Sequence, residues 1–506
     1  MASSSTTYNS ANSLRKILFA ASEALPLIKT GGLADVAGSL PPALCALDLD
    51  VRLVLPAYPQ AVERAIPLKT VATLRISGVP EPVRILEEKV DGRLHVYLID
   101  APSMFSRPGS PYTEASGRPW GDNAQRFALF CRAVVHIALN QAGLGWHPDV
   151  VHCNDWQTGL VPALLAQEWD RPATIFTVHN LSYQGMFDLS TFIQLQLPDE
   201  LWSPEGLEFH DQMSFIKGGL VFADWLTTVS PTYAKEIRTA EFGYGLEGLL
   251  DHRSERLTGV LNGIDYHVWD PATDIDITHT YTADSFHLKQ ANKLALQKDM
   301  GLEQDKDAML FGNIGRMVEQ KGIDMVIDIL PEMMQNQKVQ IVILGSGDEQ
   351  LEKAMLEAAK PYPGRAVVTI GYDEALAHRI EAGCDCFLMP SRYEPCGLNQ
   401  LYSLRYGTVP IVNRTGGLAD TVIDLSPASM LDETATGFVF NSPDAASMLQ
   451  AVKRAIEYYQ RPGLWWEKLA TRGMSQDFSW DASAMHYLEI YRMAVDRPAK
   501  NPVAAA

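Results

Sequence analysis

The chain alternates short, continuously apolar segments with longer stretches of helical pattern, and this alternation constrains its fold more than any other feature. In the first half, the apolar segments lie at 16–20, 51–56, 94–100, 149–153, 174–178 and 226–230. Helical patterns at 122–141 and 157–168 separate some of them. Strands that are apolar at every position are typical of a sheet covered on both faces, so this order predicts a parallel, doubly wound sheet.

The same alternation restarts near residue 308. Five more apolar segments follow there, with the sequences AMLFGNIG, VQIVILG, AVVTIG, CFLMP and TVPIVN. A chain of 506 residues also exceeds the ~250–300 residues that one hydrophobic core organises. We therefore expect an α/β protein with two Rossmann-like, doubly wound domains facing across a cleft, in which ligands bind at the carboxyl ends of the strands.

Breaks in the pattern predict the domain limits. The segment 261–307 is rich in turn formers and interrupts the alternation, so the N-terminal domain is expected to cover 14–260 and the C-terminal domain 261–477. The amphipathic stretch 478–496 is expected to form a helix that packs back on the N-terminal domain. The remaining segments are interpreted as a disordered tail at 1–13 and a second tail at 497–506.

Composition excludes several classes of protein. The net charge of −19 argues against nucleic acid or an anionic membrane as a partner. No apolar run approaches the ~18 residues of a membrane span, and the polar N-terminus lacks the apolar core of a secretory signal. The six cysteines form no CxxC pair, so we expect a reduced, cytoplasmic protein, with a remnant organelle transit peptide as the alternative. Nothing in the sequence indicates an oligomeric state.

The hexapeptide TGGLAD occurs twice, at Thr30–Asp35 and at Thr415–Asp420. Each copy follows a predicted strand and opens a predicted helix, where glycines permit close approach of a ligand and free N–H groups attract an anion. The alternative is that Gly-Gly only permits a tight turn or close packing, but its repetition in both halves favours a binding role. The residues expected to bind a phosphate-containing donor are Lys29, Gly31 and Gly32 in the first copy and Thr415, Gly416 and Gly417 in the second.

Two cations follow the first strand of the second half. Arg316 ends the segment FGNIG and Lys321 lies in the same loop, so both are placed to bind diphosphate oxygens, unless they are ordinary surface charges. Three DxD strings, at 48–50, 274–276 and 305–307, are interpreted as solvated surface. The residues alone leave open whether fixed cations bind the phosphate.

Three further side chains come directly after predicted strands. Glu394 precedes a helix that begins near Leu398, and it either contacts a ligand through its carboxylate or serves the start of that helix. His179 follows the strand at 174–178, where it is either an active-site group or a satisfied polar residue. Tyr372 is either a stacking platform for a nucleotide base or an ordinary core or boundary aromatic.

Eight motifs occur in order along the chain: KTGGLADV, HCNDW, TVHNLSYQG, VSPTYAKEI, LNGID, GRMVEQKG, SRYEPCGLNQL and TGGLADTV. From about residue 16 to about residue 493 the chain closely resembles the bacterial glycogen synthases and plant starch synthases that use ADP-glucose. The resemblance implies a GT-B fold and the transfer of glucose from ADP-glucose to the non-reducing-end 4-hydroxyl of an α-1,4-glucan such as glycogen. It further implies retention of the anomeric configuration, release of ADP, and no cofactor. The resemblance also implies that Arg316 and Lys321 are the cations that bind the diphosphate, with no metal.

The resemblance also assigns roles to residues of this chain. It places His179, Glu394, Arg316, Lys321 and the acceptor-side acid Asp155 in the catalytic site. Asn262 matches a donor-side position, and Gly397 and Leu398 would face phosphate or ribose. Because sugars pack on aromatic faces and hydrogen-bond to carboxylates, we also expect glucan contacts from Glu23, Tyr112 and Trp156.

Four positions depart from the pattern of related enzymes. Asn399 replaces a common Thr, which puts direct phosphate contact by this side chain in doubt. Tyr402 stands where the wider retaining class often has a second Glu, as is usual in this family. Asn154 and Gln157 stand where relatives often have His, so no His-specific role is carried over.

Two alternatives remain open. A glucan phosphorylase shares the architecture but needs a lysine-bound pyridoxal phosphate and a longer chain, and no segment matches that requirement. A catalytically silent glucan-binding protein is disfavoured by the intact set of charged residues.

Since no carboxylate is placed as a nucleophile, retention predicts substitution from the same face, with the leaving phosphate taking the acceptor's proton. We also expect the two domains to close on the substrates.

Overall fold

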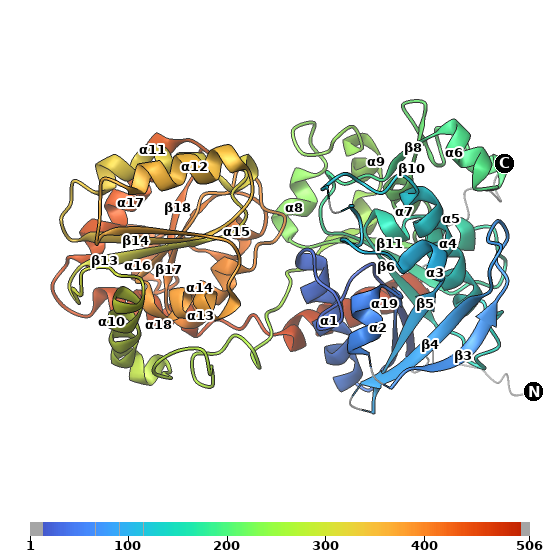
Figure 1. The fold of residues 1–506 in the computed structure, drawn as a ribbon, viewed down its shortest axis with the longest axis horizontal. Helices are drawn as coiled ribbons and strands as arrows, with labels where there is room; N and C mark the ends of the chain where they lie inside the picture. The colour runs from blue at the N-terminus through green and yellow to red at the C-terminus, as the bar shows by residue number, and fades with distance from the viewer. Residues whose placement is uncertain (1–13, 66, 91, 115, 497–506) are drawn as a thin grey trace, which may run out of the picture. The chain divides into compact units, whose positions relative to one another are not determined.

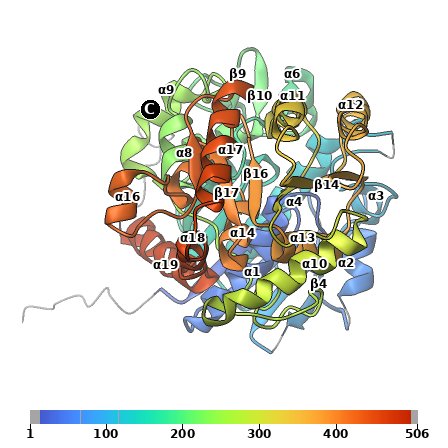
Figure 2. The ribbon, with the colours of Figure 1, turned by 90° about the vertical axis from the view of Figure 1, so that its left-hand side faces the viewer.

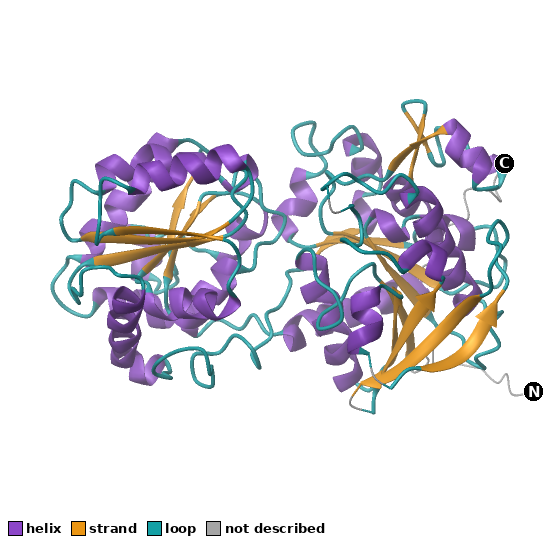
Figure 3. Cartoon of the chain, viewed as in Figure 1, coloured by secondary structure: helices purple, strands orange, loops and turns teal. Residues whose placement is uncertain are grey.

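The computed structural model describes residues 14–65, 67–90, 92–114 and 116–496, so the two predicted tails lie outside the described residues. Contacts divide the chain into two compact units. Unit 1 contains the described residues up to Val229, Ala234–Val260, and the C-terminal helix from Trp480. Unit 2 contains Ser230–Tyr233 and Leu261–Ser479. Figure 3 shows that strands flanked by helices build both units.

Unit 1 is organised by a nine-stranded sheet with the order β12-β11-β7-β6-β1-β2-β5-β4-β3. Its strands are β1 (Lys16–Ala20), β2 (Asp50–Pro56), β3 (Lys69–Leu74), β4 (Val83–Val90), β5 (Leu94–Asp100), β6 (Val150–Asn154), β7 (Ala173–Val178), β11 (Trp225–Thr228) and β12 (Leu257–Gly259). All neighbours pair in parallel except at one edge, where β4 pairs antiparallel with both β5 and β3. The predicted parallel pairing therefore holds from β12 to β5, and β4 and β3 extend the sheet with an antiparallel edge that the sequence pattern did not indicate.

Helices cover both faces of this sheet (Figure 1). One layer contains α1 (Gly32–Ala46) and α19 (Trp480–Asp496), which pack against each other, and the other contains α4 (Asn123–Ala138), α5 (Leu160–Leu165) and α7 (Phe215–Phe222). Shorter helices are α2 (Pro59–Arg64), α3 (Pro102–Phe105), α6 (Leu189–Gln194), α8 (Pro231–Glu236) and α9 (Glu247–His252). A separate antiparallel sheet joins β8 (Met186–Asp188), β10 (Gln212–Ser214) and β9 (Glu208–Phe209).

The C-terminal helix α19 is fastened to the centre of unit 1 by a buried polar network. The Nδ1 atom of His152, on β6, lies 2.8 Å from the hydroxyl of Tyr491, and its Nε2 atom lies 2.6 Å from that of Thr177. Tyr487 and Tyr491 also contact the His152 ring. Burial lowers the pKa of His152 to about 3, so the ring is neutral and joins two elements by hydrogen bonds rather than by charge.

Unit 2 contains a fully parallel six-stranded sheet with the order β15-β14-β13-β16-β17-β18. Its strands are β13 (Met309–Ile314), β14 (Val339–Gly345), β15 (Ala366–Ile370), β16 (Cys386–Met389), β17 (Val409–Asn413) and β18 (Phe438–Phe440). The first five match the predicted apolar segments, and β18 was not expected.

Two helical layers enclose this sheet, as Figures 1 and 2 show. One contains α11 (Ile323–Met333), α12 (Glu349–Ala359) and α17 (Ala445–Tyr459), and the other contains α10 (Lys289–Asp299), α13 (Glu374–Gly383) and α14 (Asn399–Tyr406). The remaining helices are α15 (Gly416–Thr421), α16 (Pro427–Leu431) and α18 (Trp465–Met474). Among the described residues, no helix combines the length and apolar character that crossing a membrane requires.

Each sheet has a point where its strand order reverses. In unit 1 the chain proceeds from β1 to β2 on one side, whereas β6 and β7 lie on the other. In unit 2 it proceeds from β13 to β14 and β15, whereas β16, β17 and β18 lie on the opposite side. Connections diverge at such a point and leave a crevice at the carboxyl ends of the two central strands, which is where open α/β sheets bind ligands.

Candidate active site

Side chains predicted for the site in unit 1 follow three neighbouring strands. Glu23 comes after β1, Asp155 after β6 and His179 after β7, so they meet at the carboxyl edge of the sheet beside the β1/β6 reversal point. Burial, and to a smaller extent the negative charge of Glu23, raise the pKa of Asp155.

His179 is held at both its ring and its backbone. Asn154 donates from Nδ2 to the carbonyl of Ala20 (3.0 Å), which turns its Oδ1 toward the Nε2 atom of His179 at 2.9 Å. The ring therefore carries its proton on Nε2 and keeps Nδ1 as an acceptor. The carboxylate of Asp155 accepts from the backbone N–H groups of His179, at 2.7 Å, and Asn180. Asn154 thus positions the histidine, a role that sequence reasoning missed because the contact depends on neighbouring strands.

Burial controls the charges of this group. It lowers the pKa of His179 to about 3, so the imidazole is neutral at physiological pH. It raises the pKa of Asp155 to about 7, against the opposing effect of the two backbone hydrogen bonds. Burial also raises the pKa of Glu23, which accepts hydrogen bonds from the Thr30 hydroxyl and from the amides of Thr30 and Gly31.

Because the pKa of Asp155 is raised in the folded protein, we expect the free energy of unfolding to depend on pH through this group. An unfolded Asp titrates near ~3.9, so between about pH 4 and pH 7 the folded chain holds a proton that the unfolded chain has lost. The contribution of this group is fully present below pH 4 and is lost as the pH rises through 7. Asp155→Asn should therefore lose less thermal stability than the wild type between pH 5 and pH 7.5, as measured by calorimetry. The prediction would be contradicted if the melting temperatures of the variant and the wild type changed by the same amount between pH 5 and pH 7.5.

Two aromatic residues predicted for acceptor binding occupy packed positions in unit 1. Tyr112 is partly exposed, and its hydroxyl lies 2.7 Å from that of Ser22. Trp156 is partly exposed and contacts the rings of Phe127 and Phe215. Both rings therefore pack at the edge of the sheet and keep part of their surface accessible.

In unit 2, Lys321 and Glu394 meet at the β13/β16 reversal point. The Lys321 Nζ atom lies 2.5 Å from Glu394 Oε2, and the hydroxyl of Ser391 donates to the same oxygen at 2.9 Å. Glu394 is buried, whereas Lys321 is partly exposed. Arg316 is exposed, and among the described residues its guanidinium has neither a hydrogen-bond nor an ion-pair partner. One edge of the sheet therefore carries the carboxylate of Glu394, the Lys321 ammonium that pairs with it, and the Arg316 guanidinium, which can bind a ligand.

Residues around this pair are positioned by the loop that precedes α14. Asn399 donates from Nδ2 to the carbonyl of Ile314 at 2.7 Å, so its amide nitrogen holds the end of β13. Gly397 and Leu398 directly precede the helix, with Leu398 at its N-cap and Gly397 at a φ of 74° that favours glycine. Asn262 is buried, and its Oδ1 atom has no partner in the described part of the chain.

Tyr372 follows β15, two strands from β13, and is 71% exposed. Neighbouring strands lie ~4.8 Å apart, so this aromatic ring stands roughly 10 Å from the reversal point. That spacing suits a group that contacts the base of a nucleotide whose phosphates lie at β13 and β16. Its exposure disfavours the alternative of a core aromatic.

The two TGGLAD copies have different environments. In the first, Gly31 and Gly32 are exposed, and a Cβ atom added at Gly32 would meet no atom within 4 Å. In the second, Gly416 and Gly417 are buried, and added Cβ atoms would lie 2.0 Å from the carbonyl oxygen of Glu394 and 2.1 Å from that of Cys396.

The N–H of Gly417 donates to the carbonyl oxygens of Glu394 (3.1 Å) and Pro395 (3.2 Å), so it is already engaged. The expectation that this amide offers a free donor is therefore corrected. The second copy fastens the loop that carries Glu394, because only glycine permits so close a backbone approach.

Lys29 precedes the exposed first copy and pairs with Asp35 at 2.8 Å. The lysine side chain is 40% exposed, and an ion pair of that kind is worth only ~0–1 kcal/mol. Lys29 can therefore exchange Asp35 for a bound anion at little cost.

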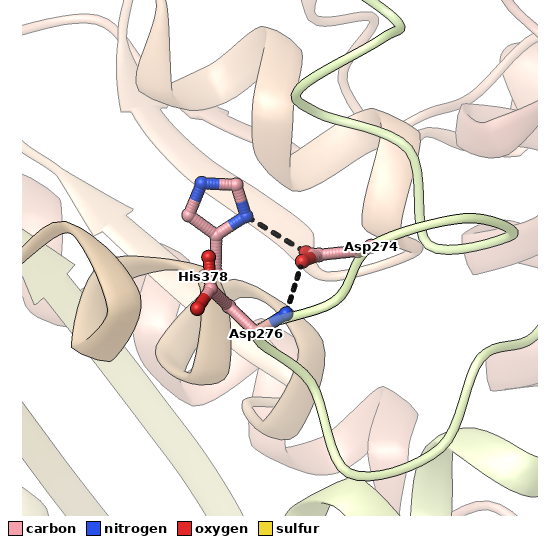
Figure 4. A group of neighbouring side chains, drawn as sticks. All are labelled: Asp274, Asp276 and His378. Atoms are coloured by element: carbon pink, nitrogen blue, oxygen red, sulfur yellow. Dashed lines mark hydrogen bonds and ion pairs between the residues drawn. The ribbon is translucent and has the colours of Figure 1, made fainter.

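One DxD string does not lie on solvated surface as expected. Asp274 is buried, and Figure 4 shows its carboxylate facing His378 and the backbone N–H of Asp276. The distances are 2.7 Å to His378 Nδ1 and 2.8 Å to the Asp276 nitrogen, and the hydroxyl of Tyr406 donates to the same carboxylate. Burial opposes its charge, but these hydrogen bonds hold the pKa of Asp274 below its usual value.

Ligand atoms of Asp274, Asp276 and His378 lie within 4.8 Å of one another, as a metal site would require. However, the Nδ1 atom of His378 and the Oδ2 atom of Asp274 hydrogen-bond directly to each other, so these two atoms are already engaged and do not face an ion. Trp269 stacks on the His378 ring at 3.8 Å and on the Tyr402 ring at 3.9 Å. Asp274, Trp269 and His378 therefore join the segment before α10 to α13 and α14. Tyr402, at the position where the wider retaining class often has Glu, packs against Trp269 in this group.

Comparisons with known proteins agree with this geometry. Residues 16–252 match the family model of the starch synthase catalytic domain, and residues 297–463 match that of glycosyl transferases group 1. The structure of the catalytic domain of starch synthase IV from Arabidopsis thaliana bound to ADP and acarbose aligns with a TM-score of 0.86 at 34% identity, covering 96% of this chain and all of that one. A sucrose-phosphate synthase from Thermosynechococcus elongatus, at 17% identity and a TM-score of 0.58, shares the fold over 95% of this chain and 98% of its own.

Two α/β domains with polar groups at their strand ends define a glycosyltransferase of the GT-B class, which confirms the predicted fold class. Glycogen synthase 2 of Nitrosococcus oceani is 53% identical over 95% of this chain and 98% of its own length. Glycogen synthase 1 of Methylococcus capsulatus is 53% identical over 95% and 97%. The chain belongs to the glycogen synthase family.

Proposed function

We propose that the chain transfers glucose from ADP-glucose to the non-reducing-end 4-hydroxyl of an α-1,4-glucan, with retention at the anomeric carbon and release of ADP. The observation that carries this proposal is the Lys321–Glu394 pair at the β13/β16 reversal point, together with Arg316, which follows the same strand β13 and has no side-chain partner among the described residues. A leaving diphosphate gains negative charge as the glycosidic bond breaks, and two fixed cations stabilise that charge.

The groups of unit 2 would act on the donor. Arg316 and Lys321 bind the diphosphate oxygens, and Glu394 accepts hydrogen bonds from donor sugar hydroxyls and offsets the positive charge of an oxocarbenium-like transition state. Tyr372 stacks on adenine. Asn262, with its orphaned Oδ1, accepts a hydrogen bond from the donor. Gly397 and Leu398 face phosphate or ribose, and Thr415, Gly416 and Gly417 support the Glu394 loop.

The groups of unit 1 would act on the sugars. Neutral His179 accepts a hydrogen bond from a donor sugar hydroxyl through Nδ1, since Nε2 is committed to Asn154. Asp155 keeps the histidine backbone in place, and Glu23 and Trp156 contact the glucan. Lys29, Gly31 and Gly32 bind phosphate. The acceptor oxygen attacks the anomeric carbon from the face that the phosphate leaves, and a phosphate oxygen takes its proton, so no covalent glucosyl-enzyme forms.

One experiment tests the donor and the chemistry together. Initial rates on glycogen are measured side by side with ADP-glucose and UDP-glucose, each with and without a chelator. We expect faster transfer from ADP-glucose and no effect of the chelator. A preference for UDP-glucose would overturn the assigned donor, and loss of activity with chelator would overturn catalysis by protein cations alone. A glucosyl adduct trapped on the protein with a slow fluorinated donor would contradict same-face substitution.

A further inference from the structure

A second cavity lies in unit 1 at the amino edge of the sheet, opposite the edge that carries His179. Asp149 precedes β6, Ala173 begins β7 and Val495 lies near the end of α19, and all three line it. The cavity has a volume of about 460 Å³. Its other lining residues are His147, Pro148, Gln167, Glu168, Trp169, Arg171 and Pro172.

Trp169 stands at the mouth of this cavity with 98% of its surface exposed. Tryptophan is highly buried on average because its indole ring is large and mostly apolar. A bare indole beside a cavity therefore offers a flat apolar face for a ligand, and the prolines and Val495 extend that apolar wall.

Two charged residues that line the cavity already have partners. Arg171 forms a bidentate pair with the buried Asp224, at 2.6 Å and 2.9 Å. Asp149 accepts the backbone N–H groups of Arg15 and Lys16 at 2.8 Å and 2.9 Å. The guanidinium of Arg171 is therefore occupied, and the described residues that line the cavity include no other arginine or lysine that could bind a phosphate.

The remaining polar groups suit hydroxyls. The side chains of His147 and Glu168 are exposed and have no partner among the described residues, and the Gln167 side chain uses its Nε2 atom on the carbonyl of Ala163. These side chains supply both donors and acceptors next to the indole face. A neutral ligand with apolar faces and many hydroxyl groups fits this surface, whereas Glu168 repels anions.

We propose that this cavity, with Trp169 as its stacking platform, is a second binding site for α-glucan chains. The identity of the ligand rests on the proposed function, which makes a glucan the acceptor. The six residues of β7 separate the cavity from His179 by ~20 Å at ~3.3 Å per residue. The two sites therefore hold different glucose units, and a polymer held at the cavity raises the concentration of chain ends near the reacting groups.

The test compares wild type, Trp169→Ala and Trp169→Phe, with Trp465→Ala as a matched control because Trp465 is an exposed indole that does not line the cavity. Affinity electrophoresis in gels with glycogen measures binding without any donor. We expect Trp169→Ala to bind roughly tenfold more weakly, the loss typical of removing an aromatic anchor. Trp169→Phe should retain most of the binding, and Trp465→Ala should bind as the wild type does.

Kinetics provides a second readout. Trp169→Ala should raise the KM for glycogen while leaving kcat, and the rates on a short maltooligosaccharide, unchanged. Equal glycogen affinity in Trp169→Ala and the wild type would overturn the proposal, as would an equal loss in Trp465→Ala. Binding that depends on Trp169 in a protein that transfers no glucose would support this site and refute the proposed activity, so the two failures are distinguishable.

Discussion

Replacing Lys321 with alanine should lower kcat by ~10²–10³-fold, the loss typical when one group that stabilises developing negative charge is removed. The substitution removes a cation from the diphosphate and leaves the carboxylate of the buried Glu394 with the hydroxyl of Ser391 as its one side-chain partner among the described residues. Steady-state rates with saturating ADP-glucose and glycogen measure the effect. Melting curves recorded on the same preparations separate lost catalysis from lost folding.

Two further variants isolate the role of the pair. Lys321→Arg keeps a cation and should recover part of the rate, because a guanidinium also pairs with a carboxylate and with phosphate. In the double variant Lys321→Ala/Glu394→Gln, the increase in activation free energy derived from kcat should be smaller than the sum of the increases in the two single variants. The reason is that the two side chains share one interaction. A Lys321→Ala enzyme with a kcat within threefold of the wild type would show that the cation is not part of the catalytic site.

Gly417→Ala should destabilise unit 2 by about 3 kcal/mol or more, at the upper end of the cost of overpacking. The added methyl group would lie 2.1 Å from the carbonyl oxygen and 2.6 Å from the Cα atom of Cys396. Both are backbone atoms that cannot rotate away, so the loop carrying Glu394 would have to move. Denaturant unfolding measures the loss, and kcat should fall with it even where the protein remains folded.

Gly32→Ala is the matched control from the first copy. No atom lies within 4 Å of the added Cβ atom, and alanine is the better residue at the start of α1. Stability should stay within about 1 kcal/mol of the wild type or rise. If the Gly32 turn binds the donor, the KM for ADP-glucose should increase because the methyl group blocks close approach. Equal destabilisation by the two substitutions would refute the difference between the copies.

The fold was largely predictable because parallel strands buried on both faces are apolar at every position. The antiparallel strands β3 and β4 were missed since β4 lies near the sheet edge and mixes Arg84, Glu87 and Lys89 with its apolar residues. The predicted helix at 157–168 is divided into a short turn and α5. Gly159 lies between them, where an added Cβ atom would be 1.9 Å from the carbonyl oxygen of Phe215.

The candidate site was predictable in part. Residues at strand ends, such as His179 and Glu394, could be found because topology places strand ends at one edge. The hydrogen bond of Asn154 to His179 could not, since it depends on the register of neighbouring strands. Nor could the burial of Asp274, whose polar neighbours in sequence resemble those of a surface turn. The roles of the site residues remain predictions for the variants described above.

The return of α19 to unit 1 has a consequence for synthesis on the ribosome. Unit 2 is complete in sequence at Ser479, but unit 1 lacks the helix that covers His152 until Tyr487 and Tyr491 have been made. The unit that is begun first is therefore finished last, and its apolar face must be kept from other chains while the intervening residues are translated. A chain interrupted after residue 479 should yield a folded unit 2 joined to an aggregation-prone unit 1.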